Sequence, residues 1–169
     1  MTVSLRTVRF SDLSEVISDA EALERDGYRS LGTWNLGQVC VHLSTVMRAF
    51  IEGFPEPPAS ARVPLWLTRN SIAQFARGRA MLTRTVTGSI ATFPEMVPPA
   101  GVDDAEGLAE LKDWIARTRA HSGGFEPSPS LGVLSAQEVE ALHMLHCAHH
   151  LGFLVPLTNL ADDGRDARA

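Results

Sequence analysis

The sequence lacks long apolar runs, lacks an excess of basic residues and has few cysteines, and each absence excludes a class of protein. No stretch approaches the roughly 18 apolar residues of a membrane-spanning helix, and the first residues lack the apolar core of a signal peptide. The formal net charge of −5 argues against nucleic acid as a partner, because phosphate binding needs a basic surface. Both cysteines, Cys40 and Cys147, lie in apolar surroundings, which is typical of reduced core residues in a cytoplasmic protein.

Length and composition indicate one globular domain. The chain has 169 residues, of which 44% are hydrophobic and 21% charged, so it is long enough to bury a sizeable core. The last residues, ADDGRDARA (161–169), are small, polar and charged. We therefore expect a single domain over residues 1–161 and a flexible tail over residues 162–169.

Strand signals are weak, whereas apolar residues recur three and four positions apart, as in amphipathic helices. The clearest such stripe lies in residues 34–53. The fold is therefore predicted to be all-α, with four long helices in a bundle and one additional short helix or helical loop. The predicted helices cover residues 11–25, residues 34–53, a segment from Pro64 to between 82 and 90, residues 103–120, and a segment that starts after residue 135.

Three of these helices carry a recognisable start signal. Ser11 is placed to cap the first helix. Pro64 suits the first turn of the third, because its missing N–H would be unpaired there in any case. The segment SAQE (135–138) is a capping box, in which Ser135 accepts a hydrogen bond from the N–H of Glu138 while Glu138 reaches back. The capping box places the histidine-rich segment that follows on a helix.

Four of the six histidines lie in the segment LHMLHCAHHLGFL, residues 142–154. Each helical residue turns by about 100°, so His146 and His150 fall one turn apart near the middle of an apolar face. We expect both at core positions. A buried imidazole is costly unless both ring nitrogens find partners, and a divalent metal ion supplies one partner to each ring. The spacing of these two histidines is therefore typical of a metal site.

A metal site needs at least one further ligand, and His42 is the natural candidate. It lies at the edge of the apolar stripe of the second helix, beside Val39 and Val46. Taken alone, His42 is better explained as a hydrogen-bonded histidine at the edge of the core. Together with His146 and His150, the ligand interpretation is favoured. We therefore predict a divalent metal ion held by His42, His146 and His150.

The remaining histidines have weaker claims. His143 lies on the other edge of the apolar face, where it could contact the ion or a substrate, although a structural role is favoured. His149 is expected to bond a neighbouring helix or to face the surface. His121 suits an interaction with the C-terminal dipole of the fourth helix. Glu138 is accounted for by the capping box and Glu140 is expected to be exposed, so no carboxylate is placed as a general base.

Two motifs resemble those of a known superfamily. TWNLGQVCVHLSTVM (33–47) resembles the second-helix motif of the DinB-like superfamily, and HCAHHLGFL (146–154) resembles its terminal signature, roughly N-H-x-x-H-H-R-G-Q. The similarity is closer to the DUF1569 family, which shares a segment like RTVRFSDLSEVISDAEAL (6–23). That family also shares the block S-x-G-x-W-x-L-G-Q-x-x-x-H-L (30–43) and G-x-L-S-x-x-E (132–138) before a histidine-rich helix.

This resemblance implies ligand status for His42, His146 and His150, in a helical bundle whose metal lies in a cavity open at one end. Two departures stand out. Leu151, Gly152 and Phe153 replace the Arg-Gly-Gln of the signature, so any polar contact of that Arg or Gln is absent. Some relatives carry His-Pro shortly before the last helix, where this chain reads PSPSLG (127–132).

The resemblance also implies function, because better-known DinB-like proteins include enzymes that use low-molecular-weight thiols. The first expectation is a metal-dependent thiol transferase or hydrolase with a small-molecule substrate, and a homodimer is compatible with this superfamily. The alternatives are a non-catalytic metal- or ligand-binding bundle and a metal-free structural bundle. Three imidazoles suit zinc, nickel, iron and copper alike. Arg69, Arg77 and Arg84 could hold an anionic group of the substrate, although a solvated helix face explains them more simply.

Overall fold

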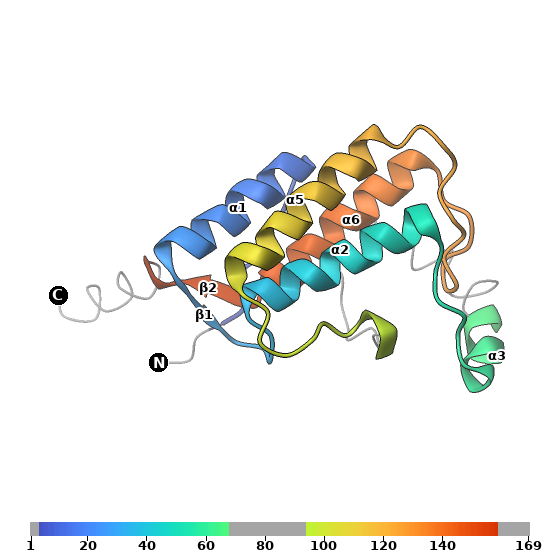
Figure 1. Ribbon diagram of the computed structural model, residues 1–169, viewed down its shortest axis with the longest axis horizontal. Helices are drawn as coiled ribbons and strands as arrows, with labels where there is room; N and C mark the ends of the chain where they lie inside the picture. Colours follow the sequence, from blue (N-terminus) through green and yellow to red (C-terminus); the bar gives the residue numbers. More distant parts are fainter. Residues whose placement is uncertain (1–3, 68–93, 159–169) are drawn as a thin grey trace.

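The computed structural model describes residues 4–67 and 94–158 and is mostly helical, which confirms the expected all-α class (Figure 1). Its only sheet among these residues is a short two-stranded one. No helix in the described part of the chain combines the length and apolar character needed to cross a membrane. The elements are α1 (Leu13–Asp26), β1 (Tyr28–Ser30), α2 (Leu36–Glu52), α3 (Ala59–Leu67), the 3-10 turn η2 (Pro94–Met96), α5 (Asp104–Ala120), α6 (Ala136–Leu151) and β2 (Leu154–Pro156).

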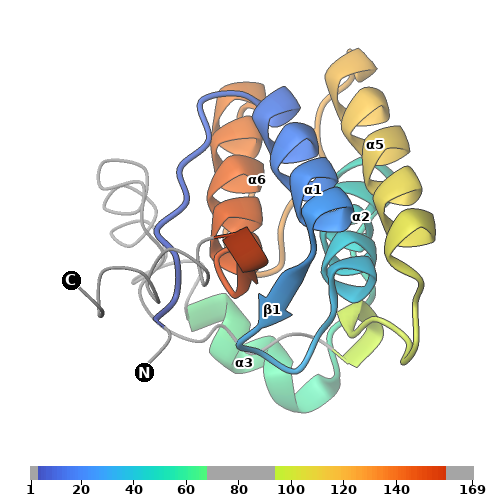
Figure 2. The same ribbon diagram turned by 90° about the vertical axis from the view of Figure 1, so that its left-hand side faces the viewer.

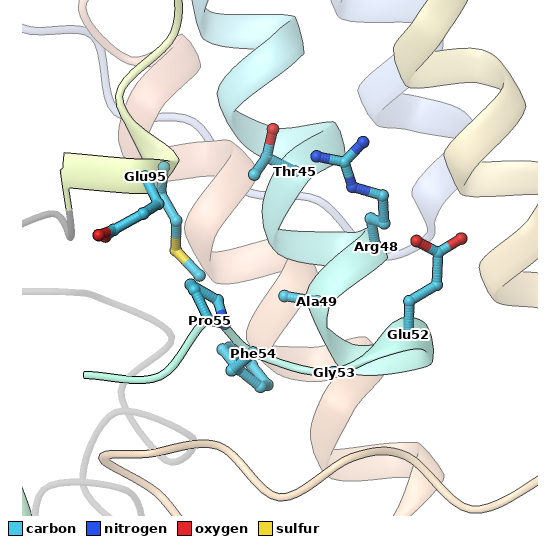
Figure 3. Close-up of a pocket in the computed structure, with 9 residues that line it drawn as sticks. Thr45, Arg48, Ala49, Glu52, Gly53, Phe54, Pro55 and Glu95 are labelled. Atoms are coloured by element: carbon cyan, nitrogen blue, oxygen red, sulfur yellow. The ribbon is translucent and has the colours of Figure 1, made fainter.

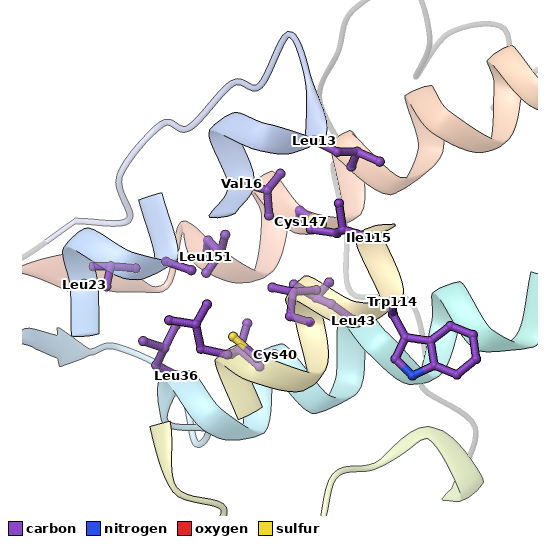
Figure 4. Close-up of a cluster of buried hydrophobic side chains, with 14 of the residues drawn as sticks. Leu13, Val16, Leu23, Leu36, Cys40, Leu43, Trp114, Ile115, Cys147 and Leu151 are labelled. Carbon is purple, nitrogen blue, oxygen red and sulfur yellow. The ribbon is translucent and has the colours of Figure 1, made fainter. Parts of the chain in front are cut away.

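The four long helices, α1, α2, α5 and α6, lie side by side in both views (Figures 1 and 2). Helix α2 packs against α5 and α6, and α1 packs against the same two helices. Their facing side chains form one apolar core, and Figure 4 shows many of its residues between the helices. Cys40 and Cys147 are free thiols in this core, as expected, and burial raises the pKa of both. The core includes Leu13, Val16, Leu23, Leu36, Leu43, Leu111, Ile115 and Leu151.

Capping side chains mark the helix starts, with one correction. The capping box of Ser135 and Glu138 is present at the start of α6, as predicted, and α5 starts after its N-cap Asp103. Helix α1 is capped by Asp12 and not by Ser11: the Asp12 carboxylate accepts from the N–H of Ser14. A carboxylate is favoured there because the helix N-terminus carries partial positive charge.

The third helix begins earlier than predicted. Helix α3 starts at Ala59, which puts Pro64 inside the helix and not in its first turn. A proline there removes the hydrogen bond to the carbonyl of Ser60, but Ser60 is exposed, so water can reach that carbonyl. The rest of the predicted helix, with Arg69, Arg77 and Arg84, lies outside the described residues.

Helices α2 and α5 approach each other through two glycines. A Cβ atom added at Gly107 would lie 2.4 Å from the carbonyl oxygen of Gly37, and one added at Gly37 would lie 2.4 Å from the carbonyl oxygen of Asp103. Neither distance is compatible with a side chain, so the two backbones are in direct contact. This contact fixes the N-terminal half of α2 against the N-terminal turn of α5.

The small sheet joins the beginning of the fold to its end. Strand β1 pairs antiparallel with β2, with Tyr28 opposite Pro156 and Ser30 opposite Leu154. The backbone N–H of Leu31 extends the pairing by donating to the carbonyl of Phe153, at 2.9 Å. The loop that enters α2 is therefore bonded to the segment that leaves α6. These are the two helices that carry the candidate site.

Candidate metal centre

Helix α6 buries a different row of side chains from the one predicted. Val139, His143, Cys147 and Leu151 follow each other at intervals of four and are at most 1% exposed. His146 and His150 lie beside this row and are partly buried, so the prediction that they occupy core positions is confirmed only in part. The helix therefore has two rows of side chains at intervals of four, one with His143 and Cys147 and one with His146 and His150. The row with His143 and Cys147 faces the core. The imidazoles of His146 and His150 lie at the edge of the core.

His42, on α2, faces the imidazoles of His146 and His150. It is 3% exposed, and its Nδ1 atom lies 2.8 Å from the carbonyl oxygen of Met96 in η2. A carbonyl only accepts hydrogen bonds, so Nδ1 of the neutral ring must carry the proton. The other nitrogen, Nε2, then keeps its lone pair for a ligand. Hydrogen bonding of one ring nitrogen to a carbonyl is the usual arrangement of a metal-binding histidine.

The structure brings the three predicted ligands together. One ring nitrogen of each of His42, His146 and His150 lies within 4.8 Å of the other two, and the Nε2 atoms of His42 and His146 are 3.2 Å apart. Two nitrogens bound to one tetrahedral ion at about 2.0–2.1 Å would be separated by about 3.3 Å. The donor set and its spacing therefore fit a divalent transition-metal ion, although an N–H···N hydrogen bond would give a similar distance.

Burial and mutual repulsion keep these imidazoles neutral. Burial, followed by the neighbouring His42 and His149, lowers the pKa of His150 to about 3. Burial, followed by the neighbouring histidines with His150 first, places the pKa of His146 well below its usual range, and burial lowers the pKa of His42. Neutral rings offer their lone pairs without first losing a proton. The neutral charge state that metal binding needs is therefore the resting charge state near neutral pH.

Two further rings, those of Trp34 and His149, pack against the three-histidine group. The indole of Trp34 stacks on His150, with ring centroids 5.7 Å apart and planes at 20°, and lies 5.0 Å from the ring of His42. The ring of His149 lies 5.0 Å from that of His150 and 5.5 Å from that of Phe153. His149 is half-buried and is not part of the ligand group. Among the described residues, the group contains no carboxylate that could act as a base.

His143 lies in the core, in line with the structural role that the sequence favours. It is 1% exposed, its ring meets Phe50 edge-on at 5.3 Å, and its Nε2 atom has no hydrogen-bond partner among the described residues. Burial lowers its pKa to about 4. His121 ends α5, as expected from its position, and its Nε2 atom lies 3.2 Å from the carbonyl oxygen of Gly124. Neither residue joins the three-histidine group.

A pocket of about 370 Å³ lies on the outer side of α2, beside η2 (Figure 3). Arg48 and Glu52 line it from α2, and Glu95 lines it from η2. Met96 also lines this pocket, while its carbonyl contacts His42. The pocket and the three-histidine group therefore share one turn of the chain.

Two contributors to the site were missed by sequence reasoning. The carbonyl of Met96 has no sequence signature, because every residue carries one. Trp34 had a signal: it directly precedes Asn35, the N-cap of α2, and a bulky aromatic at a helix entrance often packs against the neighbouring element. Its contact with His150 could not be read from spacing, because it depends on the pairing of β1 with β2.

Comparison with known proteins confirms the resemblance to the DUF1569 family. A family model described as "Protein of unknown function (DUF1569)" matches residues 2–157. No curated protein and no solved structure matches the chain.

Proposed function

This chain belongs to the DUF1569 family, whose description names no activity, and from its geometry we propose that it is a metal-binding protein. His42, His146 and His150 would hold one divalent ion through their ring nitrogens. The observation that carries the proposal is the meeting of three neutral imidazoles from two helices, with nitrogens within 4.8 Å of one another. Zinc, nickel and iron all suit such a ligand set.

The proposed site is compatible with catalysis by a bound metal ion. Three protein ligands leave at least one position for water or a small molecule, and a bound divalent ion makes water or a thiol more acidic. The three histidines would hold the ion, the Met96 carbonyl would orient the ring of His42, and Trp34 packs against the rings of His42 and His150. We propose a metal-dependent thiol transferase or hydrolase acting on a small molecule, with a low-molecular-weight thiol as the candidate ligand.

Two further proposals, one on the fold and one on the function, accompany this one. The four helices that lie side by side, with ligands on α2 and α6, support a four-helix bundle of the DinB-like type. The second candidate function is metal or ligand binding without catalysis. It is favoured by one observation: the ligand group, within the described residues, includes no carboxylate to serve as a general base.

Metal content tests the proposal directly. Protein purified without a histidine tag, and its His146→Ala variant, should be analysed by elemental mass spectrometry after dialysis against zinc, nickel or iron(II). We expect about one ion per chain in the parent protein and none in the variant. His121→Ala is the matched control, because it removes a histidine outside the group and should keep the ion.

Negligible metal in both the parent and the His146→Ala protein would overturn the proposal and leave a metal-free bundle. For the metal-loaded protein, the visible spectrum of the cobalt(II) form should change when cysteine or glutathione is added, because a thiolate entering the open position alters the ligand field. An unchanged spectrum at millimolar thiol, with no turnover of thiol and electrophile, would favour binding without thiol catalysis.

A further inference from the structure

We propose that Trp34 is a positioning residue of the metal centre, which fixes the ring of His150 in the orientation that the ion requires. The inference rests on the proposed metal site and adds a role for an indole that touches two of its three ligands at once. Trp34 stacks nearly parallel to His150, with planes at 20°, and its ring centroid lies 5.0 Å from that of His42.

The need for such a residue follows from how the two ligands differ. The ring of His42 is held by its Nδ1 hydrogen bond to the Met96 carbonyl. The ring of His150 makes no hydrogen bond to the described part of the chain, and its ring contacts there are with Trp34, His42, His146 and His149. Histidine rings rotate easily about their last side-chain bond, so a stacked neighbour has to do what a hydrogen bond does elsewhere.

Trp34 is well anchored for this task. Its carbonyl accepts a 2.8 Å hydrogen bond from the hydroxyl of Ser30, the last residue of β1. Ser30 in turn lies opposite Leu154 in the β1–β2 pair, and Leu31 bonds Phe153 just after α6. Leu154 lies four positions after His150, so the backbone of Trp34 is fixed relative to the turn of α6 that bears His150.

Stacking also favours the loaded state. An imidazole that donates its lone pair to a cation becomes electron-poor, and the electron-rich face of an indole attracts such a ring more strongly than a neutral one. Trp34 should therefore contribute to metal affinity as well as to ring orientation. Loss of the indole should weaken binding by about tenfold, the size expected for one aromatic pair.

The test uses the full-length protein, cobalt(II) as the probe and three variants. Trp34→Leu removes the aromatic face, Trp34→Phe keeps a ring, and Trp114→Phe alters a tryptophan of the α5 core. For each, the cobalt(II) dissociation constant, the visible spectrum of the loaded protein and the urea midpoint of the metal-free protein should be measured. Trp114 is 8% exposed and is absent from the ring contacts of the histidines, so its variant reports on loss of stability alone.

We expect Trp34→Leu to bind cobalt(II) about tenfold more weakly and with a changed visible spectrum, and Trp34→Phe to restore most of both. Trp114→Phe should lower the urea midpoint but leave the spectrum unchanged. A Trp34→Leu protein with the affinity and spectrum of the parent would overturn the role of Trp34 while leaving the metal site intact. A parent protein that binds no cobalt(II) would overturn the metal site itself, and this inference with it.

Discussion

The Nε2 atom of His42 lies 3.2 Å from the Nε2 atom of His146, although 104 positions separate the two residues in the chain. Because Nδ1 of His42 donates to the Met96 carbonyl, its Nε2 atom is an acceptor, and in the metal-free protein the Nε2 atom of His146 must be the donor. An ion placed between them would displace that proton. His146 would then carry its proton on Nδ1, so metal binding requires a change of tautomer at His146.

Metal affinity should depend little on pH between 7 and 5.5. Protons compete with the ion only below the ligand pKa values, and burial lowers these for all three histidines, to about 3 for His150. Three imidazoles with an ordinary pKa of about 6.5 would instead lose roughly 500-fold in affinity over this range. Chelator-competition titrations with cobalt(II) at both pH values check this. A loss of several hundredfold would mean that the rings titrate as free imidazoles do.

Replacing His143 with leucine should flatten the pH dependence of stability. Its pKa is about 4 in the folded protein, against about 6.5 in an unfolded chain, so the unfolded state binds the extra proton first as the pH falls. The parent protein should keep its full stability above pH 6.5 and lose about 3 kcal/mol from this residue between pH 6.5 and 4.

Urea unfolding of metal-free His143→Leu at a series of pH values measures this difference. At pH 7 the variant should be at least as stable as the parent, because it removes a buried ring nitrogen that has no hydrogen-bond partner in the described part of the chain. Equal slopes of unfolding free energy against pH in the two proteins would show that His143 does not titrate in this way.

Gly107→Ala should destabilise the protein although alanine is the better helix former. Helix propensity favours alanine by about 1 kcal/mol, but the new methyl group would lie 2.4 Å from the carbonyl oxygen of Gly37. Forcing α2 and α5 apart should cost more, for a net loss of about 2–3 kcal/mol. Gly124→Ala is the matched control, because a Cβ atom there meets nothing within 4 Å. Urea midpoints that move equally for both variants would contradict the backbone contact.

Arg6→Ala should destabilise the end of α6. The guanidinium of Arg6 bonds both carboxylate oxygens of Asp19, at 2.7 and 2.5 Å, and donates to the carbonyl of Leu151. Both charged side chains are largely shielded, at 18% and 21% exposed, so the loss should be about 2 kcal/mol in unfolding free energy. Arg25→Ala, which breaks the exposed pair with Asp26, should have little effect. Equal urea midpoints for the two variants would show that Arg6 does not stabilise this helix end.

The sequence predicts the long helices and the composition of the candidate site better than it predicts their details. The capping box at Ser135 and the three-and-four spacing of α2 are local signals, so they could be read directly. Strands β1 and β2 have 3 residues each, too few for an alternating pattern to appear. The sequence also does not show which row of α6 faces the core, because histidine is compatible with either side of an apolar helix. Only packing against the other helices decides between His143 and His146.

The contact between Gly37 and Gly107 has a consequence for the choice of ion. Because the backbones of α2 and α5 touch, α2 cannot shift toward α5 to make room at His42. Helix α6 meets His42 through the imidazoles of His146 and His150, which leaves more freedom at that interface. Ions with longer metal–nitrogen bonds would therefore be accommodated on the α6 side, by a shift of that helix or of its imidazoles. Discrimination between ions by radius would then depend on how firmly that one helix is held.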